Sequence, residues 1–204
     1  MIATTPRRNL FPAASNQSER GTDAWPGLKE SLESIVAACQ RQDRSAQREL
    51  YERCNARVFR LAIRMVGVQD ASDLTQQVFL RVYHTIRQFT GRSGFETWLY
   101  RLTVNECLQF LRYAKRRSHE ALKYEPATRY PGISRDIQAR ESLDLALQRL
   151  DPDLRAVFLL REVERLGYRE LAETLEISEG TVASRLNRAR SKLKEHLLDL
   201  GWEI

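Results

Sequence analysis

The sequence is poor in the residues that build cross-linked or metal-held scaffolds. It has three cysteines in 204 residues, Cys39, Cys54 and Cys107, and they lie far apart. Neither a CxxC pair nor a Cys/His cluster occurs. We therefore expect no disulfide framework, no metal site and no cofactor. Free thiols fit a reducing cytosol.

Long apolar runs are also missing. No stretch of about 18 apolar residues exists, and no apolar run follows the Arg7–Arg8 pair. We expect neither a membrane span nor a signal peptide, and hence a cytoplasmic protein without membrane insertion. No strand-type alternation and no fixed repeat can be found, which favours an all-α fold. No nucleophile–base pair, carboxylate pair or phosphate loop is recognisable, so we expect no enzyme and no small-molecule substrate.

What the sequence does have is an uneven positive charge. The net charge is +6 and the isoelectric point is about 9.5, which suits a polyanionic partner. Residues 87–117 hold seven bases and two acids, and residues 178–196 hold five bases and two acids. Residues 150–177 hold seven acids and four bases. Two basic segments thus flank an acidic one.

The second basic segment has the pattern of a helix-turn-helix. Residues 166–175 predict a short helix, and Ser178 is a suitable N-cap for the helix that follows. That second helix has a buried stripe at helical spacing: Val182, Leu186, Ala189, Leu193 and Leu197. Its other face carries Ser184, Arg185, Asn187, Arg188 and Lys192. This arrangement is typical of a helix that reads duplex DNA, although a solvated surface helix is the alternative.

The first basic segment combines a loop and a long helix. Residues 88–95 form a loop with two glycines and an arginine, and a helix is predicted from Phe95 to Arg117. One polar stripe of that helix carries Arg101, Asn105, Gln109, Arg112 and Arg116. Bases interleaved with aromatic residues suit single-stranded nucleic acid. Phe95 and Trp98 are also explained as ordinary core residues.

The helix that precedes this loop has an exposed polar face. Asp73, Gln76 and Gln77 lie opposite a stripe of apolar residues in the segment from Asp73 to Arg87. Intrinsic helix propensity does not explain why Asp and Gln gather on one face of this helix. It is either solvated filler or a surface that binds a partner, and periodicity leaves both open.

Composition divides the chain into four parts. Residues 1–25 read as a disordered N-terminal tail. Residues 26–117 and 139–204 read as two small helical domains, and residues 118–138, which contain Pro126, Pro131 and Gly132, read as a flexible linker.

Two blocks of sequence resemble a known family. Residues 73–112 (beginning DLTQQVFLRVY) and residues 150–193 (beginning LDPDLRAVFLLRE) are similar to regions 2 and 4 of extracytoplasmic-function (ECF) sigma factors of the sigma-70 family. The resemblance covers about residues 28–198. It implies an RNA polymerase sigma factor that directs core polymerase to promoters and initiates transcription.

The resemblance also implies roles for residues. Asp73, Gln76 and Gln77 match the face that binds polymerase, although the family usually has Glu where this chain has Gln77. The −10 strand would be bound by Thr90, Gly91, Arg92, Ser93, Arg101, Asn105, Arg112 and Arg116. The −35 duplex would be read by Thr181, Ser184, Arg185, Asn187, Arg188 and Lys192. Core RNA polymerase, promoter DNA and an anti-sigma factor are the implied partners.

Two other classes of protein remain open. A sigma-like adaptor would keep the fold and bind a regulatory protein without touching DNA, but the two basic stripes speak against it. A helix-turn-helix repressor or activator would usually carry a ligand-binding or dimerisation domain, whereas residues 28–117 resemble a polymerase-binding module.

Overall fold

The computed structural model describes residues 29–118 and 135–202, and regular structure in these residues is entirely helical. The helices, in chain order, are α1 (Lys29–Gln40), α2 (Arg44–Val66), α3 (Val68–Thr85), the 3-10 turn η1 (Ile86–Gln88), α4 (Phe95–Ser118), α5 (Arg135–Gln148), α6 (Pro152–Glu162), α7 (Tyr168–Leu175) and α8 (Glu179–Asp199). The all-α prediction is confirmed. Among these helices, none has the length and apolarity to cross a bilayer.

Local sequence signals explain most of the helix ends. The Asp43 carboxylate accepts hydrogen bonds from Ser45 N and Ala46 N, at 2.7 and 3.2 Å, and so caps α2. Gly67 ends α2 with φ 96°, a conformation that side-chain-bearing residues rarely adopt. The same glycine directly precedes Val68, the first residue of α3. Pro152 is the first residue of α6, as its fixed φ favours.

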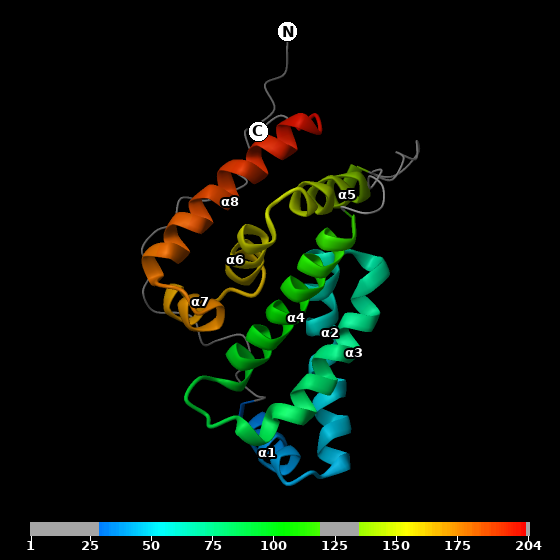
Figure 1. The fold of residues 1–204 in the computed structure, drawn as a ribbon, viewed down its shortest axis with the longest axis vertical. Helices are drawn as coiled ribbons and strands as arrows, with labels where there is room; N and C mark the ends of the chain where they lie inside the picture. The colour runs from blue at the N-terminus through cyan, green and yellow to red at the C-terminus, as the bar shows by residue number, and fades with distance from the viewer. Residues whose placement is uncertain (1–28, 119–134, 203–204) are drawn as a thin grey trace.

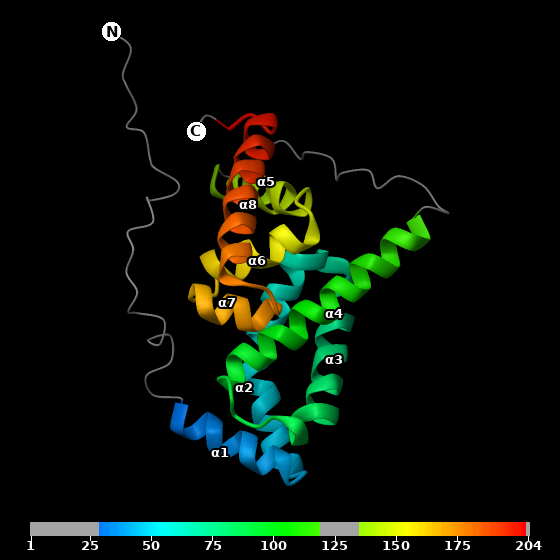
Figure 2. The ribbon, with the colours of Figure 1, turned by 60° about the vertical axis from the view of Figure 1, so that its left-hand side comes forward.

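Helix α4 lies at the centre of the molecule. Figure 1 shows α6 and α7 on one side of it and α2 and α3 on the other. Figure 2, turned by 60°, shows α1 across the end of this assembly where α4 begins. Helix α4 therefore contacts both the N-terminal helices and the C-terminal helices.

Two apolar clusters hold the helices together. One joins α1, α2, α3, η1 and the start of α4, with Leu50 and Val78 fully buried. The other begins with Leu61 and Met65 on α2 and continues through α4 into α6, α7 and α8. The second cluster thus contains residues of both predicted domains.

The predicted linker falls mainly outside the described residues. Helix α4 extends to Ser118 and α5 begins at Arg135, so the outer residues of segment 118–138 are helical. Residues 119–134 lie outside the description, as does the predicted tail at residues 1–25.

Candidate nucleic-acid interface

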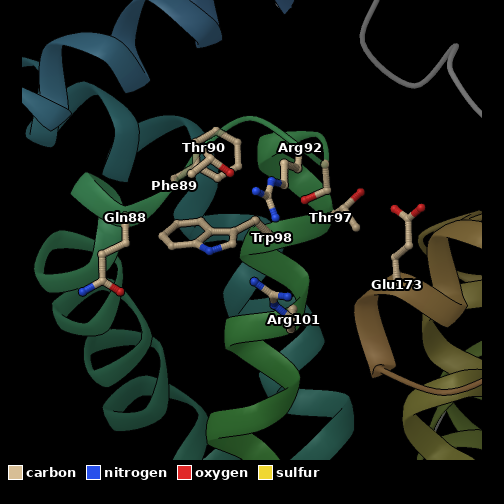
Figure 3. Close-up of a pocket in the computed structure, with 9 residues that line it drawn as sticks. Gln88, Phe89, Thr90, Arg92, Thr97, Trp98, Arg101 and Glu173 are labelled. Atoms are coloured by element: carbon tan, nitrogen blue, oxygen red, sulfur yellow. The ribbon is translucent and has the colours of Figure 1, made fainter.

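The loop between η1 and α4 borders a cavity of about 480 Å³. Four residues predicted to bind single-stranded DNA line this cavity: Thr90, Arg92, Ser93 and Arg101 (Figure 3). Gly91, at the tip of the loop, has φ 73°, which explains the choice of glycine there. Gln88, Phe89, Thr97 and Trp98 also line the cavity and were not among the predicted site residues. Gln88 and Phe89 belong to the predicted loop, and Thr97 and Trp98 lie in the first turn of α4, so their places in the sequence were the available signal.

Three aromatic rings pack against one another beside the cavity. The ring centroids of Phe89, Phe95 and Trp98 lie 5.4–5.7 Å apart in each pair. Phe95 and Trp98 are 7% exposed, so the interpretation of both as core residues is correct. Trp98 nevertheless reaches the cavity wall (Figure 3). Edge-on and tilted arrangements of this kind are favoured for aromatic pairs, so the three rings stabilise one another where the loop joins α4.

The polar stripe of α4 is divided between two cavities. Arg101 is half-buried beside the loop, whereas Arg112 and Arg116 are exposed and line a second cavity of about 740 Å³. Asn105 is exposed between them. Gln77 lines the second cavity as well. The structure therefore brings one predicted polymerase-binding residue next to two predicted DNA-binding residues.

The polar face of α3 is accessible. Asp73, Gln76 and Gln77 are all exposed, as periodicity indicated. Leu80, one turn farther along the same helix, is 59% exposed and joins this face. Sequence analysis missed Leu80, although its position outside the apolar stripe was visible in the spacing.

The helix-turn-helix forms as predicted. The Ser178 hydroxyl accepts a hydrogen bond from Thr181 N at 3.1 Å and caps α8. The predicted buried stripe of α8 is confirmed, since all five of its residues are buried: Val182, Leu186, Ala189, Leu193 and Leu197. The turn contains Glu176, which takes a left-handed conformation with φ 55° at the end of α7.

The opposite face of α8 presents the predicted reading residues unequally. Ser184, Asn187, Arg188 and Lys192 are exposed, whereas Thr181 and Arg185 are half-buried. Thr181 and Ser178 share a hydroxyl–hydroxyl bond of 2.8 Å, and the Ser184 hydroxyl donates to Thr181 O at 3.0 Å. These hydroxyls have local partners, so the longer side chains on this face are better placed to reach a groove.

Two acidic residues, one in α7 and one just after it, lie close to the loop cavity or to its lining arginine. Arg101 Nη1 lies 3.4 Å from Glu176 Oε1, and Glu173 lines the cavity from the α7 side (Figure 3). Both carboxylates come from the acidic segment recognised in the sequence. A predicted DNA-binding arginine is therefore paired with a carboxylate of the C-terminal helices.

A second contact between the two halves is more deeply buried. The Tyr100 hydroxyl donates to Glu164 Oε2 at 2.5 Å, and Arg57 Nε lies 3.3 Å from the same oxygen. Burial, and then the bond to Glu164, raises the pKa of the Tyr100 phenol, so it stays protonated as a donor. Sequence analysis did not identify this group, because its members are distant in the chain.

Arg155 ties the ends of two helices together. This residue of α6 is 5% exposed. Its guanidinium donates to Met65 O on α2, to Gln148 O at the end of α5 and to Leu150 O just after α5. Burial lowers the pKa of Arg155 to about 10, which still leaves it charged at neutral pH. A buried cation here satisfies carbonyl groups that helix ends leave without partners.

Cysteines and metal-ligating side chains in the described residues bear on whether a nucleophilic thiol or a metal site is present. Cys39, Cys54 and Cys107 are free and buried. Burial raises the pKa of the Cys39 and Cys54 thiols to about 11 and that of Cys107 to about 12. Across residues 29–118 and 135–202, no group of His, Cys, Asp or Glu could hold a metal ion.

Comparison with known families gives two matches in chain order. Residues 50–117 match the family described as Sigma-70 region 2. Residues 140–193 match the family described as Sigma-70, region 4. The first match covers α3, the loop and α4, and the second covers the helix-turn-helix.

Full-length relatives carry consistent names. The ECF RNA polymerase sigma-E factor of Haemophilus influenzae is 32% identical over 183 residues, which cover 82% of this chain and 96% of that protein. The ECF RNA polymerase sigma-E factor of Escherichia coli is 32% identical over 176 residues, covering 78% and 90%. The ECF RNA polymerase sigma factor SigE of Mycolicibacterium smegmatis is 38% identical over 157 residues, covering 73% of this chain and 60% of that protein.

Solved structures share the fold. CnrH, solved in complex with the cytosolic domain of CnrY, superposes with a TM-score of 0.62 at 22% identity, covering 82% of this chain and 96% of that one. The sigma factor RpoE, solved with the anti-sigma factor NepR from Bartonella quintana, gives a TM-score of 0.57 at 22% identity, covering 83% and 96%.

Proposed function

This chain belongs to the ECF sigma factors of the sigma-70 family, and on that premise we propose how its residues divide the work of promoter recognition. A sigma factor directs core RNA polymerase to promoters, and polymerase performs the chemistry. Members of the family are regulators of transcription rather than catalysts. We accordingly assign this chain no enzymatic activity, and we place it in the cytoplasm.

Region 2, within residues 26–117, binds polymerase and the −10 strand. The polymerase contact is the exposed face of Asp73, Gln76 and Gln77, with Leu80 adding apolar area. The loop cavity takes an unpaired base, and Trp98 offers an aromatic surface for it. Flipping a base costs a few kcal/mol, which stacking and hydrogen bonds in a fitted pocket offset.

The strand's phosphates are neutralised by the basic residues around this cavity. Arg92 and Arg101 line the loop cavity, and Arg112 and Arg116 continue the positive surface along α4. Asn105 lies between the two pairs and can donate to or accept from a base. A basic track beside a stacking surface is the combination that single-stranded nucleic acid requires.

Region 4, within residues 139–204, reads the −35 duplex with α8. Asn187, Arg188 and Lys192 are exposed on the face opposite the buried stripe. Arg and Asn side chains can form paired hydrogen bonds with guanine and adenine edges in the major groove. Lys192 lies about one turn farther along the helix than Arg188, and phosphate is its target.

An anti-sigma factor is the proposed regulatory partner. CnrH and RpoE superpose on this chain over most of its length, and RpoE was solved with an anti-sigma factor. The same surfaces that bind polymerase and DNA here would be the ones such a partner covers.

The observation that carries the proposal is the loop cavity, which is lined by Thr90, Arg92, Ser93 and Arg101 beside the packed rings of Phe89 and Trp98. The test is transcription by core polymerase reconstituted with this chain on a library of random upstream sequences. We expect transcripts from a minority of templates that share two elements, one near −35 and one near −10.

The control is the chain with Asp73→Ala and Gln76→Ala, which should bind core polymerase less tightly with unchanged helical content. A chain that binds polymerase but yields no promoter-specific transcript would contradict the proposal. That result would favour a sigma-like adaptor that binds a regulatory protein without DNA.

A further inference from the structure

Helix α1 makes a specific polar contact with the start of the loop between η1 and α4. The Gln40 amide Nε2 donates to Phe89 O at 2.8 Å and to Ile86 O at 3.2 Å. Gln40 is the last residue of α1, and the two carbonyls lie 46 and 49 residues farther along the chain. One side chain thus connects α1 to the first residue of η1 and to the residue that follows η1.

Phe89 is the point where the loop begins. It follows η1 with φ −69° and ψ 115°, an extended conformation that directs the chain outward. Its ring packs on Phe95 and Trp98, and its carbonyl is held by Gln40. The residue is therefore fixed both through its side chain and through its backbone.

The fixed carbonyl determines the direction of the next peptide group. Phe89 O and Thr90 N–H belong to one planar, trans peptide unit, so they point in opposite directions. Holding Phe89 O toward α1 therefore directs Thr90 N–H away from α1. Thr90 and Phe89 both line the loop cavity. The orientation of this peptide thus sets the wall of the cavity on the loop side.

We propose that Gln40 is a positioning residue for −10 recognition, because it holds the Phe89–Thr90 peptide in the orientation that shapes the loop cavity. The inference rests on the proposed role of that cavity in binding the −10 strand. Gln40 acts through the loop and does not itself contact DNA.

Glutamine suits this role for chemical reasons. Its amide group donates two hydrogen bonds, and both carbonyls accept here. Glutamate has the same shape but only accepts at neutral pH, and it would oppose the carbonyl oxygens. Methionine has a similar length without a donor. Lysine has a similar reach and keeps donors, so it should partly replace glutamine.

The test compares Gln40→Glu, Gln40→Met and Gln40→Lys in the complete polymerase complex. The probes are two promoter libraries, one with the −10 segment randomised and one with the −35 segment randomised. We expect Gln40→Glu and Gln40→Met each to lower the −10 preference roughly tenfold, because each variant loses both hydrogen bonds of the Gln40 amide. We expect Lys to keep most of that preference and all three variants to keep the −35 preference.

Three comparisons make the result decisive. Gln69→Glu, on the exposed first turn of α3, is the matched control and should leave both preferences unchanged. Thermal unfolding identifies a variant that fails to fold. If Gln40→Glu fails to fold, the comparison of Gln40→Met with Gln40→Lys tests the inference. Arg101→Ala tests the proposed function itself.

Equal −10 preference in the Met and Lys variants would overturn the inference, whether both match the parent or both fall. If Arg101→Ala lowers the −10 preference while the Gln40 variants do not, the role of Gln40 is lost and the proposed function stands. If Arg101→Ala has no effect either, the assignment of the loop cavity to the −10 strand fails first.

Discussion

At the scale of single residues, some buried side chains of this chain also line a cavity or make polar contacts. Trp98 and Phe95 were predicted as core, and both are buried, while Trp98 also lines the loop cavity. Arg155 was not singled out in the sequence, because nothing in its neighbourhood distinguishes a buried arginine from a surface one. Its carbonyl partners on α2, at the end of α5 and just after α5 become visible only in the folded chain.

The three thiols give a prediction about reactivity. Burial raises the pKa of the Cys54 thiol from its ordinary value of 9.0 to about 11, so the thiolate is scarce at pH 8. Because the thiolate is the nucleophile, alkylation by iodoacetamide should be roughly 100-fold slower in the folded chain than in urea. Mass spectrometry over time measures this. Equal rates for folded and unfolded chain at any of the three cysteines would contradict the burial of that cysteine.

At the scale of elements, sequence patterns predicted helices and their buried faces well. The stripe from Val182 to Leu197 and the N-cap at Ser178 are confirmed, because both depend on local spacing and local hydrogen bonds. The Phe89–Gln40 contact could not be predicted, because hydrogen bonds between distant backbone and side-chain groups leave no periodic signal.

The cap on α8 gives a prediction about stability. Ser178→Ala removes the acceptor for Thr181 N and should lower the free energy of unfolding by about 1 kcal/mol. Ser191→Ala, on the exposed face of the same helix, is the control and should change it by less than about 0.5 kcal/mol. Urea denaturation followed by circular dichroism measures both. An unchanged midpoint for Ser178→Ala would mean that the cap contributes nothing to the helix.

At the scale of the whole molecule, the two sigma regions are packed together. The apolar core continues from α2 and α4 into α6 and α8, and Arg155, Glu164 and Glu176 make polar contacts across the same boundary. Sequence analysis identified both regions but not this packing, since complementary surfaces on separate regions have no shared pattern along the chain. The contacts matter for function, because Glu173 and Glu176 lie beside the proposed strand-binding cavity.

This packing gives a prediction about the chain without polymerase. Glu176→Arg removes the carboxylate paired with Arg101, so a single-stranded −10 oligonucleotide should bind roughly two- to fivefold more tightly at low salt. The modest size reflects the exposure of the pair. Asp199→Arg makes the same charge change at the far end of α8 and is the control. Fluorescence anisotropy measures both, and equal gains in the two variants would mean that only net charge matters.

The central claim is that two separate surfaces recognise two separate promoter elements. The most direct measurement is transcription by reconstituted polymerase from libraries randomised at −10 or at −35, with Arg101→Ala and Arg188→Ala compared against the parent. The account predicts that Arg101→Ala lowers the −10 preference alone, and that Arg188→Ala relaxes one −35 position at a cost of about 1–3 kcal/mol. If both variants keep both preferences and full activity, or if each variant changes both elements equally, the account is contradicted.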